Sequence, residues 1–175
     1  MADRDESKSR ILGASIAILT RDGLGGWTID EVARRAGCAK GLVNYHYKTK
    51  TELLDRSAVE LLRRRRGTRL EALSNHPGGS TLDDLWAVLA EDVRSGRFAA
   101  AISLTASGLP QSPEPPGDGL RHAAARALDV PTSALPDDLV LGAVLDGLEL
   151  QLLQGMPLEA VREAYHRLWL GLIET

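Results

Sequence analysis

The stretch Thr28–Lys50, TIDEVARRAGCAKGLVNYHYKTK, carries the signals that decide the fold. Thr28 and Glu31 have the spacing of a capping box, in which a hydroxyl and a carboxylate satisfy free amides at the start of a helix. Gly37 suits the left-handed conformation that commonly ends one. Between these signals, apolar residues recur at the i, i+3, i+4, i+7 spacing of a helix with one buried face, namely Ile29, Val32, Ala33 and Ala36. The pattern predicts a short helix.

A second short helix is expected directly after the first. The residues after Gly37 leave room for a turn and one short helix, from Ala39 to about Tyr45. Val43 and Tyr47 lie four apart and would face inward. Thr49 with Glu52 then repeats the helix-start signal. Two short helices joined through a glycine turn have the shape of a helix-turn-helix, whose second helix can enter a DNA major groove.

The other residues of this second helix and its flanks are of types that suit a DNA groove. Lys40 can reach a phosphate or a guanine edge, and Asn44 can pair with an adenine edge. Lys50 lies in the first turn of the next helix, where free amides attract anions. The candidate DNA contacts are Thr28, Lys40, Gly41, Leu42, Asn44, Tyr45, His46 and Lys50. These residues alone are equally compatible with a small helical hairpin that has a solvated polar face.

Residues 11–54 resemble the DNA-binding domain of the tetracycline-repressor (TetR) family of bacterial transcription regulators. An alanine-rich first helix is followed in register by Gly23, Thr28, Ile29, Val32, Ala33, Ala36, Gly37, Lys40, Gly41, Tyr45, His46, Tyr47, Lys50 and Leu53. Three residues depart from the family pattern. Ala39 stands where a capping Ser is usual, Asn44 where a Tyr is common, and Leu42 where a small polar residue is frequent. These departures bear on the DNA sequence that is read, not on the fold.

The resemblance implies an all-α protein with two domains. We expect a three-helix helix-turn-helix DNA-binding domain at residues 1–52 and a helical ligand-binding and dimerisation domain at residues 53–175. The first helix is predicted to run from Ser7 or Ser9 to about Thr20. In the second domain, residues 74–80 and the Pro-rich residues 109–119 are predicted to connect helices.

A long helix is predicted from Thr49 through Arg66 towards Leu73. Such a helix can link a DNA contact at Lys50 to another domain some twenty residues later, at about 1.5 Å of rise per residue. The consecutive arginines Arg63–Arg66 point in all directions around it. We interpret them mostly as solvated or salt-bridged, with the alternative that one lines an anion site or contacts flanking DNA.

Composition and charge fit a nucleic-acid-binding head on a soluble body. Residues 1–70 hold 15 Lys and Arg against 9 Asp and Glu, whereas residues 71–175 hold 6 against 15. No apolar run approaches the roughly 20 residues that span a bilayer, and the charged start MADRDESKSR lacks a hydrophobic signal segment, so we expect a cytoplasmic protein. The single cysteine, Cys38, excludes an internal disulfide and is expected to be a small packed side chain.

An enzyme is the competing class of protein, and the motifs that would support one are missing from the sequence. There is no Gly-rich phosphate loop after a strand, no His pair at ligand spacing and no Gly-x-Ser-x-Gly. The four histidines are scattered over different predicted elements. We therefore expect no catalytic residues, no cofactor and no metal.

The last two predicted helices, residues 137–154 and 157–173, are apolar on more than one face and so ask for a partner. In proteins that this chain resembles, these helices pack against their twins in a four-helix dimer interface. A homodimer would place two recognition helices on a two-fold axis to read a palindrome. The predicted interface residues are Leu141, Leu145, Leu148, Leu152, Val161, Tyr165, Leu168, Trp169 and Leu172.

The body between these segments holds candidates for an apolar cavity with a few polar groups. They are Trp86, Leu89, Val93, Phe98, Ile102, Thr105, His122 and Asp146, each of which alone can equally be plain core. The resemblance implies that a small apolar or amphipathic molecule binds there and releases DNA, as expected of a repressor. The alternative is a DNA-binding protein whose body only dimerises or docks a protein partner.

Overall fold

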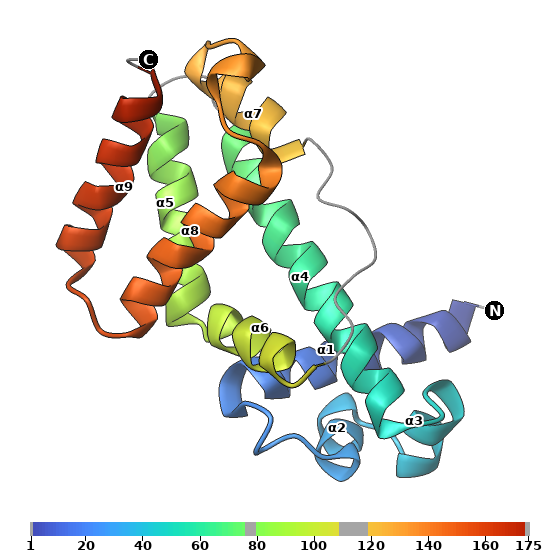
Figure 1. Cartoon of the computed structure of the whole chain (residues 1–175). Coiled ribbons are helices and arrows are strands. Elements are labelled where there is room, and N and C mark those ends of the chain that lie inside the picture. The colour runs from blue at the N-terminus through green and yellow to red at the C-terminus, as the bar shows by residue number, and fades with distance from the viewer. Residues whose placement is uncertain (1, 76–79, 109–118, 174–175) are drawn as a thin grey trace. The chain divides into compact units, whose positions relative to one another are not determined.

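The computed structural model describes residues 2–75, 80–108 and 119–173, and the regular structure of these residues is helical (Figure 1). The helices are α1 (Ala2–Asp22), α2 (Ile29–Ala36), α3 (Lys40–His46), α4 (Lys50–Asn75), α5 (Ser80–Arg94), α6 (Arg97–Ala106), α7 (Gly119–Leu128), α8 (Asp138–Leu153) and α9 (Leu158–Ile173), with a 3₁₀ turn at Thr132–Ala134. The all-α prediction is confirmed. Residues 109–118 of the predicted Pro-rich connection and residues 76–79 lie outside the described residues.

The chain divides into two compact units, Met1–Arg64 with Ser95–Pro113, and Arg65–Arg94 with Glu114–Thr175. The division differs from the predicted boundary after residue 52 because the first part of α4 and all of α6 pack with the N-terminal helices. The start of α6 approaches α1 closely at Gly96, which has a φ of 80°. A Cβ atom on Gly96 would lie 2.2 Å from the carbonyl oxygen of Thr20, so no side chain fits there.

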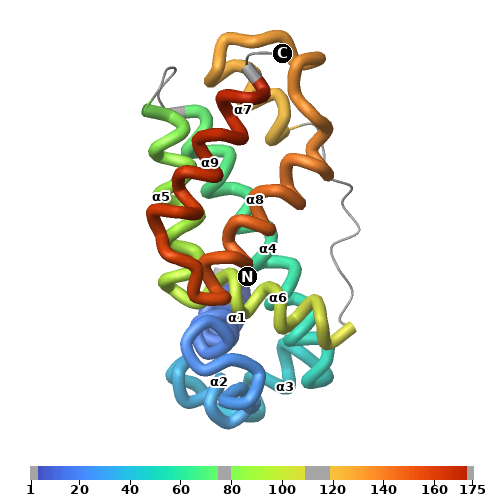
Figure 2. The backbone as a smooth tube through the Cα atoms, turned by 60° about the vertical axis from the view of Figure 1, so that its left-hand side comes forward, coloured from blue at the N-terminus to red at the C-terminus, as the bar shows by residue number. Residues whose placement is uncertain are grey.

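The predicted helix-start and helix-end signals operate in the first unit. The Thr28 hydroxyl accepts a hydrogen bond from the Glu31 amide at 3.1 Å, and Gly37 ends α2 in the left-handed conformation. At the start of α4, the Thr49 hydroxyl accepts from the Glu52 amide at 3.0 Å. Helices α2 and α3 lie next to each other and against α1 (Figure 2). The caps therefore set the entry and exit of a helix-turn-helix, as the sequence predicts.

In the second unit, α8 packs against α5, α7 and α9. The core centres on an aromatic group in which the Tyr165 ring lies 5.3 Å from the Trp86 ring and 6.1 Å from the Trp169 ring, centroid to centroid. The Tyr165 hydroxyl donates to the Leu82 carbonyl at 2.6 Å, so its one polar group is satisfied.

A buried ionic cluster ties α4 to α5 and α8 within this unit. Arg65 and Arg69 on α4 are 6% and 8% exposed. Arg65 donates to Asp92 on α5 at 2.9 Å and to Glu149 on α8 at 2.7 Å. Arg69 donates to Asp146 at 2.7 Å and also to Glu149. Buried charges persist only when paired in this way, so the cluster fixes how α4 lies against α8.

The arginine run Arg63–Arg66 thus has divided roles. Arg63 and Arg64 pair with Glu60 on the surface of α4, as interpreted from the sequence. Arg66 reaches Asp138 at 3.4 Å. Arg65 is salt-bridged, which the interpretation allowed, but it is buried because its partners, Asp92 and Glu149, approach from other helices.

Burial strongly affects the protonation of Glu149 in this cluster. Its side chain is fully buried, and its Oε2 accepts from both arginines. Its Oε1 has no hydrogen-bond partner among the residues that the structure describes. Burial raises the pKa of Glu149 from 4.5 to about 7, against the opposing effect of Arg69 and Arg65. With this pKa, Glu149 is about half protonated at neutral pH.

This pKa predicts a pH-dependent stability. Between about pH 4.5 and 7 the folded chain binds a proton at Glu149 that the unfolded chain has lost, so the free energy of unfolding decreases as the pH rises through 7. The effect is at most about 3 kcal/mol. Urea unfolding at pH 5.5 and pH 8 should show that Glu149→Gln removes much of the stability gained at the lower pH. The exposed control Glu159→Gln should behave like the parent, and an unchanged pH dependence in Glu149→Gln would contradict the prediction.

Candidate nucleic-acid interface

Helix α3 is held by two buried side chains on one face. Val43 is 0% exposed and Tyr47, which follows the helix, is 1% exposed. Ala39 at the N-cap makes no side-chain hydrogen bond, so α3 lacks the cap that a Ser would provide there. A helix of 7 residues is too short to be stable alone, so its orientation depends on packing through Val43 and Tyr47.

The opposite face of α3 presents most of the predicted DNA contacts to solvent. Lys40, Gly41, Asn44 and Tyr45 are exposed, with the Tyr45 ring 62% accessible. Leu42 and His46 are half-buried, and Leu42 packs partly against the core of the first unit. Thr28, which precedes α2, and Lys50, which begins α4, are exposed as well. The face combines a cation, an amide and a phenol, which are the groups that read phosphates and base edges.

Lys40 forms an ion pair on this surface. Its ammonium group lies 2.9 Å from the carboxylate of Asp30 on α2, whose side chain is 72% exposed. An exposed ion pair of this kind contributes about 0–1 kcal/mol. Lys40 can therefore exchange Asp30 for a phosphate or a base edge at little cost.

Lys50 stands above a buried hydrogen-bond chain. Its ammonium group lies 5.4 Å from the centre of the Trp27 ring, within the range of a cation–π contact. The Trp27 indole donates to the Ser15 hydroxyl at 2.7 Å, and the hydroxyls of Ser15 and Ser57 are 2.7 Å apart. Ser57 donates its own proton to the Leu53 carbonyl at 2.7 Å, so Ser15 must donate to Ser57. The chain joins α1, the turn before α2 and α4 beneath Lys50.

Sequence reasoning missed this arrangement. Trp27 lies in the turn before α2 and is 1% exposed. The serines carry no such signal, because Ser15 reads as part of an apolar stripe and Ser57 lies far away in the sequence. Two small hydroxyls at core positions of α1 and α4 were the only available indication.

The eight predicted pocket residues are distributed over both units. Phe98, Ile102 and Thr105 belong to α6 of the first unit, where Phe98 is buried and the other two are exposed. In the second unit, Trp86 and Leu89 belong to the buried core, Val93 is half-buried and His122 is exposed. Asp146 joins the ionic cluster. A shared ligand pocket lined by all eight stays a prediction.

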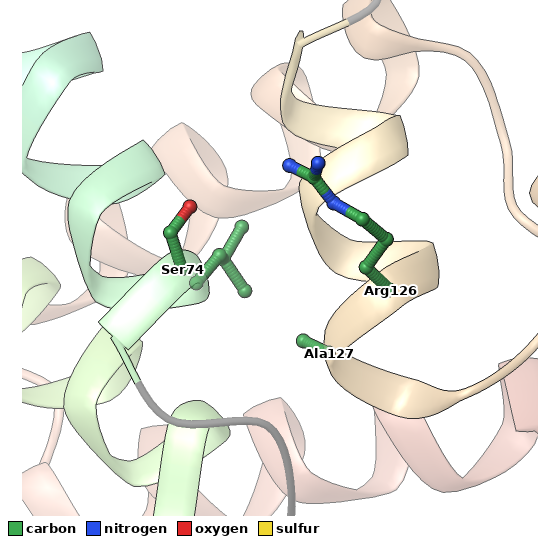
Figure 3. Close-up of a pocket in the computed structure, with 4 residues that line it drawn as sticks. Ser74, Arg126 and Ala127 are labelled. Atoms are coloured by element: carbon green, nitrogen blue, oxygen red, sulfur yellow. The ribbon is translucent and has the colours of Figure 1, made fainter.

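A cavity of about 310 Å³ lies elsewhere in the second unit. It is lined by Leu73 and Ser74 at the end of α4 and by Arg126 and Ala127 on α7. Figure 3 shows Ser74 and Arg126 on opposite sides of this space. None of the predicted pocket residues lines it, and its walls combine an apolar part with a guanidinium and a hydroxyl.

The nine predicted dimer residues differ in their exposure within the single chain, and their place in a dimer stays a prediction. Leu141, Leu145, Val161, Tyr165 and Trp169 are buried in the core of their own chain. The other four, Leu148, Leu152, Leu168 and Leu172, are half-buried. Because α8 is apolar nearly all round, periodicity could not tell which stripe faces inward. One exposed stripe of α8 is formed by Val140, Ala143, Gly147 and Leu150, and Leu139 and Leu153 of the same helix are exposed as well.

Within residues 2–75, 80–108 and 119–173, no group of His, Cys, Asp and Glu side chains is arranged to hold a metal ion. Among the same residues, no helix is both long and apolar enough to cross a membrane.

Comparison with known proteins identifies the N-terminal region. Residues 11–56 match the family model described as bacterial regulatory proteins, tetR family. The HTH-type transcriptional regulator BetI of Serratia proteamaculans (strain 568) is 29% identical over 109 residues, which are 59% of this chain and 55% of that protein. The chain spans between 25% and 55% of the length of the curated relatives it matches.

Solved structures extend the similarity over the whole fold. The crystal structure of the multidrug binding protein EbrR complexed with imidazole matches with a TM-score of 0.54 at 26% identity, over 92% of this chain and 93% of that one. A TetR-family transcriptional regulator from Haemophilus influenzae Rd matches with a TM-score of 0.65 at 16% identity, over 97% of both chains. The second similarity concerns the fold alone.

The hydrogen-bond chain beneath Lys50 yields a stability prediction. Ser15→Ala leaves the buried Trp27 indole without an acceptor, which should lower the free energy of unfolding by about 1–3 kcal/mol. Ser9→Ala, at an exposed position on the same helix, should change it by less than about 0.5 kcal/mol. Urea unfolding of both variants measures the difference. Equal midpoints for the two variants would show that the buried hydrogen bonds contribute nothing to stability.

Proposed function

Because the chain belongs to the TetR family of bacterial regulatory proteins, we propose that it is a DNA-binding transcriptional regulator that represses transcription from a palindromic operator as a homodimer. The observation that carries this proposal is the exposed face of α3, with Lys40, Asn44 and Tyr45 directed to solvent opposite the buried Val43. A seven-residue helix that presents these groups from a packed base suits insertion into a major groove.

The residues of this surface would divide between sequence reading and anchoring. Asn44 and Lys40 are suited to base edges, the first to adenine and the second to guanine or a phosphate. Lys50 lies at the first residue of α4, where its charge and the free amides of the helix start attract the same phosphate. Anchoring groups set affinity for any duplex, and base-reading groups set the preference among sequences.

Mobility shifts with DNA from the gene's own upstream region, at two salt concentrations and against a scrambled duplex, test this division. Lys50→Ala should weaken binding to both duplexes and reduce the salt dependence by about one phosphate contact. Asn44→Ala should weaken the binding free energy for the native duplex by about 1–3 kcal/mol. The ratio of native to scrambled binding should therefore decrease. The exposed Arg94→Ala serves as the charge-matched control. Unchanged affinity and salt dependence in Lys50→Ala would refute the assigned surface.

Dimerisation would use the stripe of α8 that its own chain leaves uncovered. Val140 and Leu150 on this stripe are 45% and 37% exposed, and Ala143 and Gly147 between them allow close approach of a second helix. Leu170 on α9 is also an exposed apolar residue, with an exposed fraction of 57%. Covering this surface with a second copy removes apolar area from water and generates the two-fold axis that a palindrome requires.

Leu150→Glu should convert the dimer to a monomer, since it places a charge within the proposed apolar contact. Light scattering after size-exclusion chromatography measures the mass directly. Ala87→Glu, at an exposed position of α5, introduces the same charge outside the stripe and should leave the mass unchanged. A parent protein that is already monomeric, or a dimer that survives in Leu150→Glu, would exclude this interface.

A small apolar or amphipathic ligand that releases DNA completes the proposal. The multidrug binding protein EbrR has a similar fold over most of both chains. In this chain α4 runs as one helix from Lys50 to the arginines of the ionic cluster, so a ligand that shifts those arginines has a continuous element through which to act.

The second candidate is a regulator without an inducer, whose body only dimerises or docks a protein. Thermal unfolding in the presence of a broad library of apolar compounds distinguishes the two. Stabilisation by a compound that also releases DNA supports the sensor, because a ligand that binds only the folded state raises its stability. Absence of stabilisation across the library favours the docking body.

A further inference from the structure

The first two turns of α1 lie against the recognition helix. The guanidinium carbon of Arg4 is 5.4 Å from the centre of the Tyr45 ring, and the ammonium nitrogen of Lys8 is 5.8 Å from the centre of the Tyr47 ring. The Tyr47 hydroxyl also donates to the Lys8 carbonyl at 3.3 Å. All of these residues belong to the first unit. These turns precede residue 11, where the match to the family model begins.

Basic and acidic residues are equal in number in these turns but lie on different faces of the helix. Residues 2–10 hold three basic and three acidic side chains, so the segment has no net charge. At 3.6 residues per turn, Arg4 and Lys8 share one face of the helix, and Asp5 and Glu6 are rotated away from it. The two ring contacts show that the basic face is the one beside α3.

Arg4 retains its capacity to bind an anion in this position. A guanidinium that lies over an aromatic ring keeps its N–H groups directed outward in its own plane, where they can meet a phosphate. Arg4 and Lys8 are exposed, and the Tyr45 ring under Arg4 is itself 62% accessible. Any duplex that contacts Tyr45 therefore brings its backbone within reach of Arg4.

We infer that Arg4 and Lys8 form a second DNA-contacting surface, which binds backbone phosphates of the same duplex that α3 reads. This inference rests on the proposed function, because it needs α3 to contact DNA. Phosphate contacts carry no sequence information, so the surface adds affinity and fixes the register of α3 on the duplex. It also makes the start of α1 part of the DNA-binding surface as well as a support for it.

The test measures binding of fluorescent upstream DNA by anisotropy over a range of salt concentrations, with the full-length protein. Arg4→Ala with Lys8→Ala should reduce affinity roughly tenfold near 0.1 M salt and lower the salt slope by about two phosphate contacts, with an unchanged ratio of native to scrambled binding. Arg4→Lys keeps the charge and should retain most of the slope. Arg10→Ala removes a charge from an exposed position on another face of α1 and should match the parent.

The possible results separate failure of this inference from failure of the proposed function. If the parent prefers native DNA but the double variant binds with the same affinity and slope, this inference fails while the proposed function stands. An equal loss in Arg10→Ala would show general attraction to DNA and also refute the inference. If the parent shows no preference for native DNA, the proposed function itself fails. Thermal unfolding of the single variant Arg4→Ala, which alters an exposed contact only, checks that lost binding is not lost folding.

Discussion

The burial of Val43 and Tyr47 is the constraint on which the candidate surface depends. A seven-residue helix without a side-chain cap has little intrinsic stability, so α3 exists because these two side chains pack into the core of the first unit. Once they are buried, helical geometry places Lys40, Asn44 and Tyr45 on the solvent face. The proposed DNA-reading surface is in this sense a consequence of a packing interaction on the far side of the helix.

Buried polar groups on α4 favour one register of this helix, which apolar packing alone would not specify. Near Lys50 it is joined to α1 and Trp27 through buried serine hydroxyls, which accept only one arrangement of donors. Further along, Arg65 and Arg69 enter a cluster of buried carboxylates. Apolar contacts tolerate sliding, whereas unpaired buried charges are heavily penalised, so these groups favour one register of the helix within each unit.

The helix-turn-helix could be predicted because its signals are local. Thr28, Gly37 and the apolar spacing between them act within a few residues, and the structure confirms each one. The role of Arg65 could not be predicted, because its partners lie 27 and 84 residues away and its three neighbours in the sequence look identical. The inward stripe of α8 was equally hidden, since Leu141 and Leu150 are the same residue type on different faces. Helix α1 begins before the predicted Ser7 because its first turns are charged and lack an apolar period.

The central claim is that α3 and its flanks, held by Val43 and Tyr47, contact DNA. Amide chemical shifts of isotope-labelled protein during titration with a duplex from its own upstream region test this most directly. The account predicts that the largest changes cluster at residues 28 and 40–50, with few changes on the exposed stripe of α8. Changes concentrated in the second unit, or spread evenly over basic residues of the whole chain, would contradict it.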